Sequence, residues 1–271
     1  LQVCGTVFHI KQRNAFKLQV RVDRQVPNFN TVLIWSQEQE MTDDLDHCTN
    51  RYHIYSKNAE DLPEVLHQSG IINWKQHSQT QATQSSLNEV IKNMAAAKSL
   101  TVHDQNDSLL CLETVEKLLP SLLDEKKMAS HVAKPSDINQ EMFKESSLDI
   151  SHAELVNQSW KFGGMERSLK FIHRCIQNFS NTCLLDPVGR PVSWILMDQI
   201  GESRMAGTGA KYWGKGLMTY VFYTHTHNIK NFNLPLYLHV EKINQIMIKT
   251  VLCMNCVHIP RTWNQWNCEP T

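Results

Sequence analysis

Two neighbouring stretches restrict what this chain can fold into: Gln199-Ile-Gly-Glu-Ser-Arg-Met-Ala-Gly-Thr208 and Trp213-Gly-Lys-Gly-Leu-Met218. They predict a strand that carries one carboxylate, Glu202, then a glycine-rich turn, then a helix that begins at Leu217. Such a turn leaves backbone N–H groups free at the helix N-terminus, where a phosphate or pyrophosphate commonly binds. The strand carboxylate is then a candidate general base beside a phosphorylated ligand. An ordinary strand–turn–helix explains these residues equally well, because short glycine motifs recur by chance.

The overall composition predicts a soluble globular protein of one large or two ordinary domains. The chain has 271 residues, a formal net charge of zero and 20% charged residues, and this length can bury a sizeable core. No basic run or patch indicates a nucleic-acid partner, and no apolar run has the length of a membrane-spanning helix. No heptad repeat is visible, so we expect a monomer.

The cysteines indicate reduced thiols rather than a disulfide framework. Eight cysteines in 271 residues are too few and too scattered for a disulfide-rich scaffold. Cys253 and Cys256 form a CxxC pair, but a zinc site needs a second pair, and His258 with Cys268 fits known spacings poorly. We therefore expect two inert thiols near a helix end and no bound metal.

Hydrophobic periodicity divides the chain into two α/β halves. A polar, aperiodic stretch that contains Lys134-Pro135 is the expected linker, which gives domains at 1–123 and 138–271 joined by 124–137. In the first half we expect strands at 3–10, 18–22, 31–35, 51–55, 99–103 and 109–112, and helices at 61–67, 85–97 and 114–123, with Ser85 or Ser86 as an N-cap.

The second half is predicted to run β-α-α-β-β-β-α-β-α-β, with helices on both faces of a sheet of mixed direction. The expected strands are 143–148, 182–185, 191–199, 202–208, 236–240 and 257–267, and the expected helices are 152–160, 166–177, 217–230 and 244–254. The first half alternates similarly, so it is interpreted as a decayed copy of the second.

Longer strings along the whole chain resemble one family, the mammalian glycine N-acyltransferases, which make acylglycines from acyl-CoA. The resemblance extends from Gly5 to Pro270. It is carried by Gly5-Thr-Val-Phe-His-Ile10, Gln37-Glu-Gln-Glu-Met-Thr-Asp-Asp-Leu-Asp-His47, Phe162-Gly-Gly164, Arg204-Met-Ala-Gly-Thr208 and Trp263-Asn-Gln-Trp-Asn-Cys268. It implies the N-acyltransferase (GNAT) fold in two GNAT-like halves, with acyl-CoA and glycine as substrates and no permanently bound cofactor.

The resemblance also implies roles for individual residues of the second half. Amide formation from a thioester needs a neutral amine and a donor for the tetrahedral oxyanion. Glu202 is the implied base, and we expect partial burial near Met197 and Met205 to raise its pKa. The implied oxyanion donor is a backbone N–H of Met205 or Ala206.

Coenzyme A is expected to bind at the glycine turn, with one departure from the family pattern. Gly214, Lys215, Gly216 and Leu217 are expected to hold the pyrophosphate through backbone N–H groups, and Lys215 adds positive charge. The family motif opens with Arg or Gln, whereas this chain has Trp213, which cannot donate a bidentate pair of bonds. We therefore expect weakened coenzyme A binding.

Other polar and aromatic residues have less specific interpretations. Asn244 is either a contact to the pantetheine or phosphate arm or a simple helix N-cap, and these roles are compatible. The histidines are expected to lie at the surface or in satisfied core positions, and Trp263 and Trp266 are expected to pack in the core.

Three points stay open in the sequence. A glutamine-accepting paralogue and a catalytically impaired acyl-CoA-binding relative both remain alternatives to the glycine enzyme. Relatives carry a further N-terminal amphipathic segment, so we expect the chain to be truncated before Leu1. The mitochondrial matrix is implied by the family resemblance alone.

Overall fold

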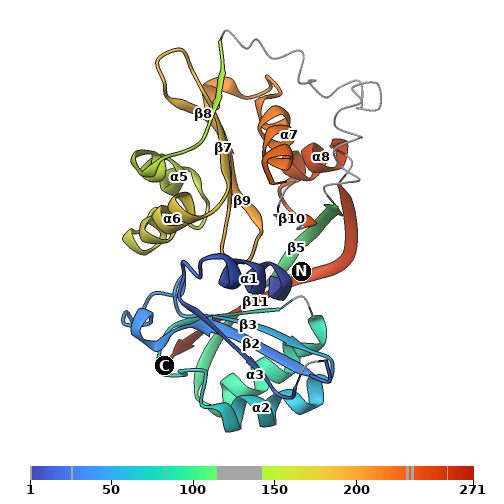
Figure 1. Cartoon of the computed structure of the whole chain (residues 1–271). Coiled ribbons are helices and arrows are strands. Elements are labelled where there is room, and N and C mark those ends of the chain that lie inside the picture. The colour runs from blue at the N-terminus through green and yellow to red at the C-terminus, as the bar shows by residue number, and fades with distance from the viewer. Residues whose placement is uncertain are drawn as a thin grey trace. The chain divides into compact units, whose positions relative to one another are not determined.

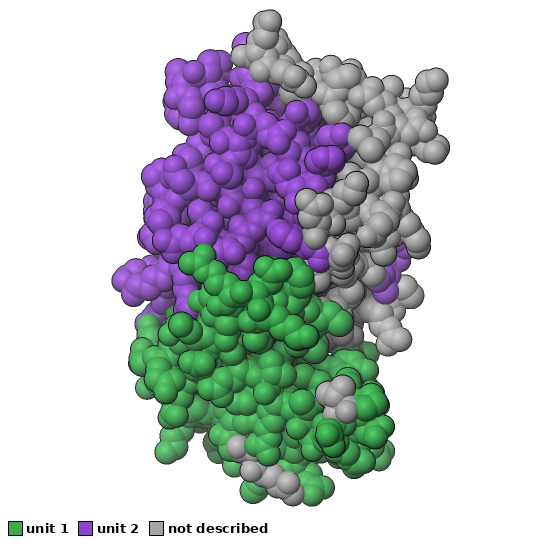
Figure 2. All heavy atoms as spheres, viewed as in Figure 1, with its two compact units in different colours: residues 1–109, 260–271 green, residues 110–259 purple. Residues whose placement is uncertain are grey.

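The computed structural model describes residues 2–25, 27–82, 84–114, 142–229, 232, 235–254 and 256–271. These form two compact units, Leu1–Leu109 with Pro260–Thr271, and Leu110–Ile259 (Figures 1 and 2). Each unit is built of helices and strands, which is the mixed α/β class predicted from the sequence.

The first unit is a sheet with helices packed against it. Its strands follow the order β1-β2-β3-β4-β11, antiparallel except for the parallel pair β3 and β4. The strands are β1 (Leu18–Val22), β2 (Thr31–Ser36), β3 (Arg51–Ser56), β4 (Ser78–Ala82), β5 (Leu100–Thr114) and β11 (Val257–Pro270), and the helices are α1 (Gln2–Gln12), α2 (Leu62–Ser69) and α3 (Asn88–Ala97). Leu66, Ile91 and Trp266 lie in its buried core.

Strand β4 was not predicted from the sequence, because its residues are polar. Ser78-Gln-Thr-Gln-Ala82 is buried along its whole length between β3 and β11. Gln79 donates to Asn267 Oδ1 at 3.1 Å, and Gln81 donates to Gln265 Oε1 at 3.1 Å. Because these amides bond to each other across the strands, their burial is tolerated.

The expected strand at 3–10 is wrong: these residues belong to helix α1. Val3 and Val7 fit an alternating pattern, and together with Ile10 they also fit a helical i, i+4, i+7 pattern, so periodicity alone leaves the choice open. Thr6 and Gly5 are buried, so packing of one helical face decides it.

Two other expectations for the first half need correction. The 3₁₀ turn Ser85–Leu87 precedes α3, and neither Ser85 nor Ser86 caps the helix, because the residue before the turn is Gln84 and no side-chain cap bond forms. The two short strands expected at 99–103 and 109–112 are one strand, β5. The helix expected at 114–123 and the linker at 124–137 lie outside the described residues.

The second unit contains a four-stranded antiparallel sheet in the order β6-β7-β8-β9. Figure 1 shows α5 and α6 on one side of this sheet and α7 on the other. The elements are β6 (Lys144–Ser146), α5 (Ala153–Ser159), α6 (Glu166–Asn178), β7 (Asn181–Leu185), β8 (Pro191–Met197), β9 (Ser203–Thr208), α7 (Leu217–Ile229), β10 (Pro235–Glu241) and α8 (Gln245–Cys253). The predicted element order of this half is confirmed.

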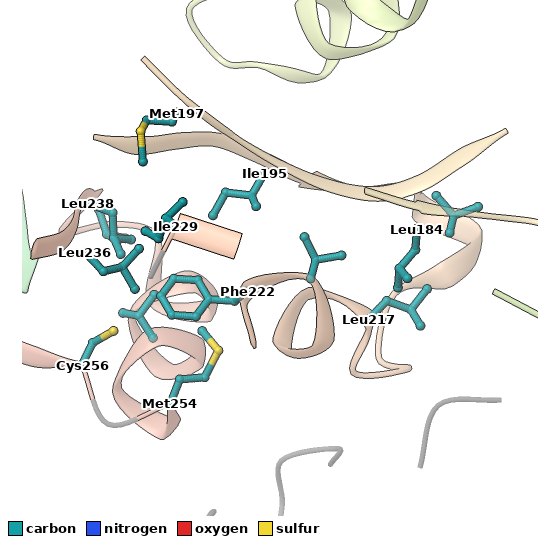
Figure 3. Packing of buried hydrophobic residues seen from close by; sticks show 14 residues of the cluster. Leu184, Ile195, Met197, Leu217, Phe222, Ile229, Leu236, Leu238, Met254 and Cys256 are labelled. Carbon is teal, nitrogen blue, oxygen red and sulfur yellow. The ribbon is translucent and has the colours of Figure 1, made fainter. Parts of the chain in front are cut away.

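An apolar cluster between the sheet and α7 fixes the helix that follows the glycine turn. Ile195 of β8 faces Phe222 and Ile229 of α7, and all three are buried (Figure 3). Complete burial of a side chain of this size stabilises a fold by about 1.5–3 kcal/mol. The helix start at Leu217, itself buried, is therefore held by the core and not only by the turn.

The two units divide the chain differently from the expected domains. Residues Pro260–Thr271 belong with the first unit, because the last part of β11 pairs with β4. The division after Leu109 falls within β5. The boundary expected at 124–137 is among residues that the structure does not describe, so it stays a prediction.

Candidate active site

Strand β9 is bulged at the residues expected to supply the oxyanion donor. Trp194 of β8 pairs with Gly207 and Leu196 pairs with Arg204, so a single residue, Ile195, opposes both Met205 and Ala206. Met205 has a φ of 54°, a conformation that non-glycine residues rarely adopt. A bulge removes one residue from the hydrogen-bonded ladder between two strands. Its backbone N–H can then donate to a ligand. The donor role of Met205 and Ala206 stays a prediction.

β9 also lies beside β10, although the two strands are not paired in one sheet. β10 belongs to the other sheet, where β5 is its neighbour, while β9 ends the four-stranded sheet. Side chains connect the two strands: the Tyr237 hydroxyl donates to Ile200 O at 2.6 Å, and the backbone N–H of His239 donates to Glu202 Oε1 at 3.2 Å.

Glu202 is held at the head of β9 by the preceding turn. Asp198 Oδ1 accepts the backbone N–H groups of Ile200 at 3.0 Å and Glu202 at 3.2 Å. Gly201, with a φ of 76°, completes this turn. The carboxylate of Glu202 is therefore positioned by a buried loop, and only 4% of its side chain is exposed.

The charges around Glu202 overturn the expected rise in its pKa. Its Oε1 lies 2.9 Å from His239 Nδ1, and its Oε2 lies 3.9 Å from Arg204 Nη1. Burial by itself raises the pKa of this carboxyl, but His239 and Arg204 together lower it further, to about 2. Glu202 is thus a buried, ionised carboxylate at neutral pH.

Arg204 connects Glu202 to a second buried carboxylate. Its Nη1 donates to Asp198 Oδ2 at 2.9 Å, and its guanidinium carbon lies 5.4 Å from the centroid of the Trp160 ring. Burial lowers the pKa of Arg204, but the two carboxylates raise it overall. The guanidinium therefore stays charged between Asp198, Glu202 and an aromatic face.

The glycine turn and the helix after it lie where the sequence predicted them. Gly214 and Gly216 have φ values of 74° and 71°, which explains glycine at both positions. α7 then begins at Leu217, and the N–H groups of its first turn have no partners within the helix. This geometry suits an anion, although pyrophosphate binding by Gly214, Lys215, Gly216 and Leu217 stays a prediction.

Trp213, where the family motif has Arg or Gln, is 71% exposed. Its indole N–H donates to Thr208 O at 2.7 Å, so its one polar group closes the turn onto the end of β9. The Lys215 ammonium lies 5.4 Å from the centroid of the Tyr212 ring. Positive charge at this turn therefore comes from lysine and not from the motif position.

Asn244 is confirmed as the N-cap of α8. Its Oδ1 accepts the backbone N–H of Met247 at 3.1 Å, and the residue is exposed. A contact to the pantetheine or phosphate arm stays a prediction.

Sequence reasoning missed His239, Arg204, Asp198 and Trp160 as members of this site. Glu202 and His239 are 37 residues apart and meet only because β9 and β10 lie side by side, so no local spacing marks the pair. His225 is a satisfied core histidine, as expected: its ring nitrogens lie 3.2 Å from the hydroxyls of Thr182 and Ser203. Trp266 packs in the core, while the side chain of Trp263 lies outside the described residues.

Three further findings concern metal ligands, membrane-spanning helices and cysteines among the described residues. No three or more histidine, cysteine, aspartate or glutamate side chains gather there as metal ligands. None of the described helices is long and apolar enough to cross a membrane. Cys253 and Cys256 are not joined in a disulfide.

Solved structures show the class of fold. A Drosophila protein solved by X-ray diffraction is 14% identical, with a TM-score of 0.75, over 100% of this chain and 89% of its own. A tandem GNAT protein from the clavulanic acid biosynthesis pathway is 8% identical, with a TM-score of 0.55, over 98% of this chain and 88% of its own. The chain therefore has the GNAT acyltransferase fold, and the tandem neighbour agrees with two GNAT-like halves.

The family is narrower than the fold. The N-terminal model of the aralkyl acyl-CoA:amino acid N-acyltransferases matches residues 1–180, and the C-terminal model matches residues 182–270. The chain is 52% identical to human glycine N-acyltransferase over all of its length and 91% of that protein. It is 51% identical to bovine glycine N-phenylacetyltransferase, with 92% of that protein covered. The chain belongs to the aralkyl acyl-CoA:amino acid N-acyltransferase family and is an acyltransferase.

Proposed function

We propose that this chain transfers an aromatic or medium-chain acyl group from coenzyme A to the amino group of glycine. Benzoyl-CoA plus glycine giving hippurate is the type reaction, and its role would be detoxification by glycine conjugation. The observation that carries the proposal is the ionised, buried Glu202 at the head of a bulged strand. Its whole-length similarity to glycine-conjugating relatives supports glycine as the acceptor.

The reaction needs no covalent enzyme intermediate. The thioester would lie along β9, with its carbonyl oxygen at the backbone N–H of Met205 or Ala206. Glu202 takes a proton from the glycine ammonium, and His239 lies 2.9 Å from its carboxylate. The neutral amine attacks the thioester carbon and the C–S bond breaks. The proton that the new amide nitrogen loses is taken up by coenzyme A, which leaves as the thiol, and Glu202 releases its proton to solvent.

The decisive experiment measures thiol release from benzoyl-CoA with and without glycine. Glu202→Gln removes the carboxylate but keeps the size of the side chain, so glycine-dependent release should fall by about 10²–10⁴-fold. Glu241→Gln is the matched control, since Glu241 lies on the neighbouring strand and pairs with Lys161 at 2.6 Å. Loss of activity in both variants alike, or in neither, would count against Glu202 as the base.

Trp213 favours a second candidate, a relative that binds acyl-CoA without turning it over. Its indole is exposed at the motif position where relatives have Arg or Gln. Calorimetric titration with coenzyme A, run beside the thiol assay with glycine or glutamine, separates the candidates. Binding of coenzyme A without thiol release, whichever acceptor is present, would establish the non-catalytic acyl-CoA binder. Thiol release with glutamine alone would establish glutamine as the acceptor.

We also propose the mitochondrial matrix as the location of this enzyme. The proposal rests on the family resemblance alone. Fractionation of cells that express the full-length protein would test it, and recovery outside mitochondria would refute it.

A further inference from the structure

Arg204 is the second residue of β9, and the proposed base, Glu202, immediately precedes this strand. The bulge begins only after Arg204. Its side chain is 17% exposed. A largely buried arginine next to a catalytic carboxylate is costly unless each of its donors has a use.

The contacts of Arg204 occupy one edge of the guanidinium. Within the described residues, its polar side-chain contacts run through Nη1, to Asp198 at 2.9 Å and Glu202 at 3.9 Å. Arginine has five N–H donors in a planar fork that matches a carboxylate. The donors on Nε and Nη2 therefore remain for a ligand.

Trp160 packs against the guanidinium of Arg204. Its ring lies 5.4 Å from the guanidinium carbon and stacks on Phe171, with the ring centroids 6.2 Å apart. An arginine held against an aromatic face loses little further freedom when it binds. Trp160 belongs to the loop between α5 and α6, and Gly163 of that loop packs so closely that a Cβ would lie 2.0 Å from Asn157 O.

We propose that Arg204 binds the carboxylate of the acceptor amino acid, and so selects an α-amino acid over a plain amine. The inference rests on the proposed function. One carbon separates the amine and the carboxylate of glycine, and 3.9 Å separates Glu202 Oε2 from Arg204 Nη1. A glycine zwitterion thus meets a negative charge with its ammonium and a positive charge with its carboxylate, without changing the net charge of the site.

Lys161 follows Trp160 in the loop between α5 and α6, and this cation fits the role less well than Arg204. Its side chain is 59% exposed and its ammonium lies 2.6 Å from Glu241 Oε1. A solvated lysine already paired with a carboxylate offers little discrimination. It is therefore the matched control for Arg204.

The experiment compares glycine with glycinamide, which has the same amine but no carboxylate. Thiol release from benzoyl-CoA is measured for both acceptors at equal concentrations of neutral amine. The wild type should favour glycine in kcat/KM. Arg204→Gln should reduce this preference by about 10- to 100-fold, Arg204→Lys should reduce it less, and Lys161→Gln should leave it unchanged.

The ratio of kcat/KM for glycine to kcat/KM for glycinamide reports recognition of the acceptor carboxylate. It does not depend on how much of the variant is folded or on the efficiency of the base. A general loss through Glu202 or through instability lowers both rates and cancels, and Arg204→Lys keeps the charge if Arg204→Gln does not fold. An unchanged ratio in both Arg204 variants, a collapse in Lys161→Gln, or equal wild-type use of glycinamide would overturn the inference while the proposed function stands. Absence of any amine-dependent release would overturn the proposed function and this inference with it.

Discussion

At the residue scale, the state of Glu202 is decided by its neighbours and not by burial. Burial alone would raise its pKa. His239 and Arg204 bring the pKa to about 2 instead. The carboxylate of Glu202 is thus ionised, and able to accept a proton, throughout the neutral pH range. A carboxylate with so low a pKa is a weak base, so the surrounding charges must compensate by stabilising the reacting groups.

The pH dependence of the rate follows from this pKa. Because a carboxylate is charged above its pKa, we expect kcat/KM for glycine to show no ionisation of Glu202 between pH 5 and 9. The rate should stay flat over this range, because the zwitterion is the form of glycine that binds and Glu202 can accept its proton throughout. His239→Asn removes the largest charge that lowers the pKa, so an acid limb should then move toward neutral pH. A wild-type inflection between pH 5 and 7, together with an unchanged profile in the variant, would contradict this account.

At the scale of the element, the bulge of β9 depends on close packing against β8. A Cβ on Gly207 would lie 2.7 Å from Trp194 Cζ2, and Trp194 is buried. The strand thus has no room to move toward β8, which holds the displaced backbone at Met205 and Ala206 in place.

Gly207→Ala should therefore distort the bulge and destabilise the fold by about 1–3 kcal/mol. Urea unfolding measures the stability, and the thiol assay should show a fall in kcat as the bulge shifts. Gly209→Ala is the matched control on the same connection, since its Cβ would meet Tyr212 only at 3.5 Å, with a φ of −58°. Equal effects of the two substitutions would argue against steric support of the bulge by Trp194.

A helix or strand could be predicted from the sequence only where its residues follow a recognisable pattern. The hairpin of β7 and β8, the helix α6 and the turn at Gly214–Gly216 follow from alternation, helical spacing and glycine. Strand β4 could not be predicted, because a buried strand of glutamines looks like a loop until β11 supplies its amide partners. Helix α1 was mistaken for a strand because one apolar pattern fits both periods.

At the scale of the whole molecule, a neutral histidine, His225, connects α7 to two strands of the second unit. His225 of α7 lies between Thr182 of β7 and Ser203 of β9, at 3.2 Å from each hydroxyl. Burial lowers its pKa from 6.5 to about 4. A neutral imidazole has one donor and one acceptor, so either tautomer can bond both hydroxyls.

Because of His225, the free energy of unfolding should fall in mildly acidic solution. Its folded pKa is depressed, so the unfolded chain binds the extra proton between pH 6.5 and 4. The stabilisation is therefore complete above pH 6.5 and is lost as the pH falls toward 4, by about 3 kcal/mol for one such group. Urea unfolding at pH 8, 6.5 and 5 should show a shallower decline for His225→Gln than for the wild type. Parallel declines would exclude His225 as the cause.

The sequence by itself determined the α/β class and the family, and it singled out Glu202 as the proposed base, because these are carried by local periodicity and by contiguous strings of residues. The tertiary structure alone decided that Glu202 meets His239 and Arg204, because β9 and β10 bring together residues that are far apart in the chain. It thereby decided the charge of the base as well. A pKa is set by the groups around a carboxylate in space, and no spacing in a sequence records them.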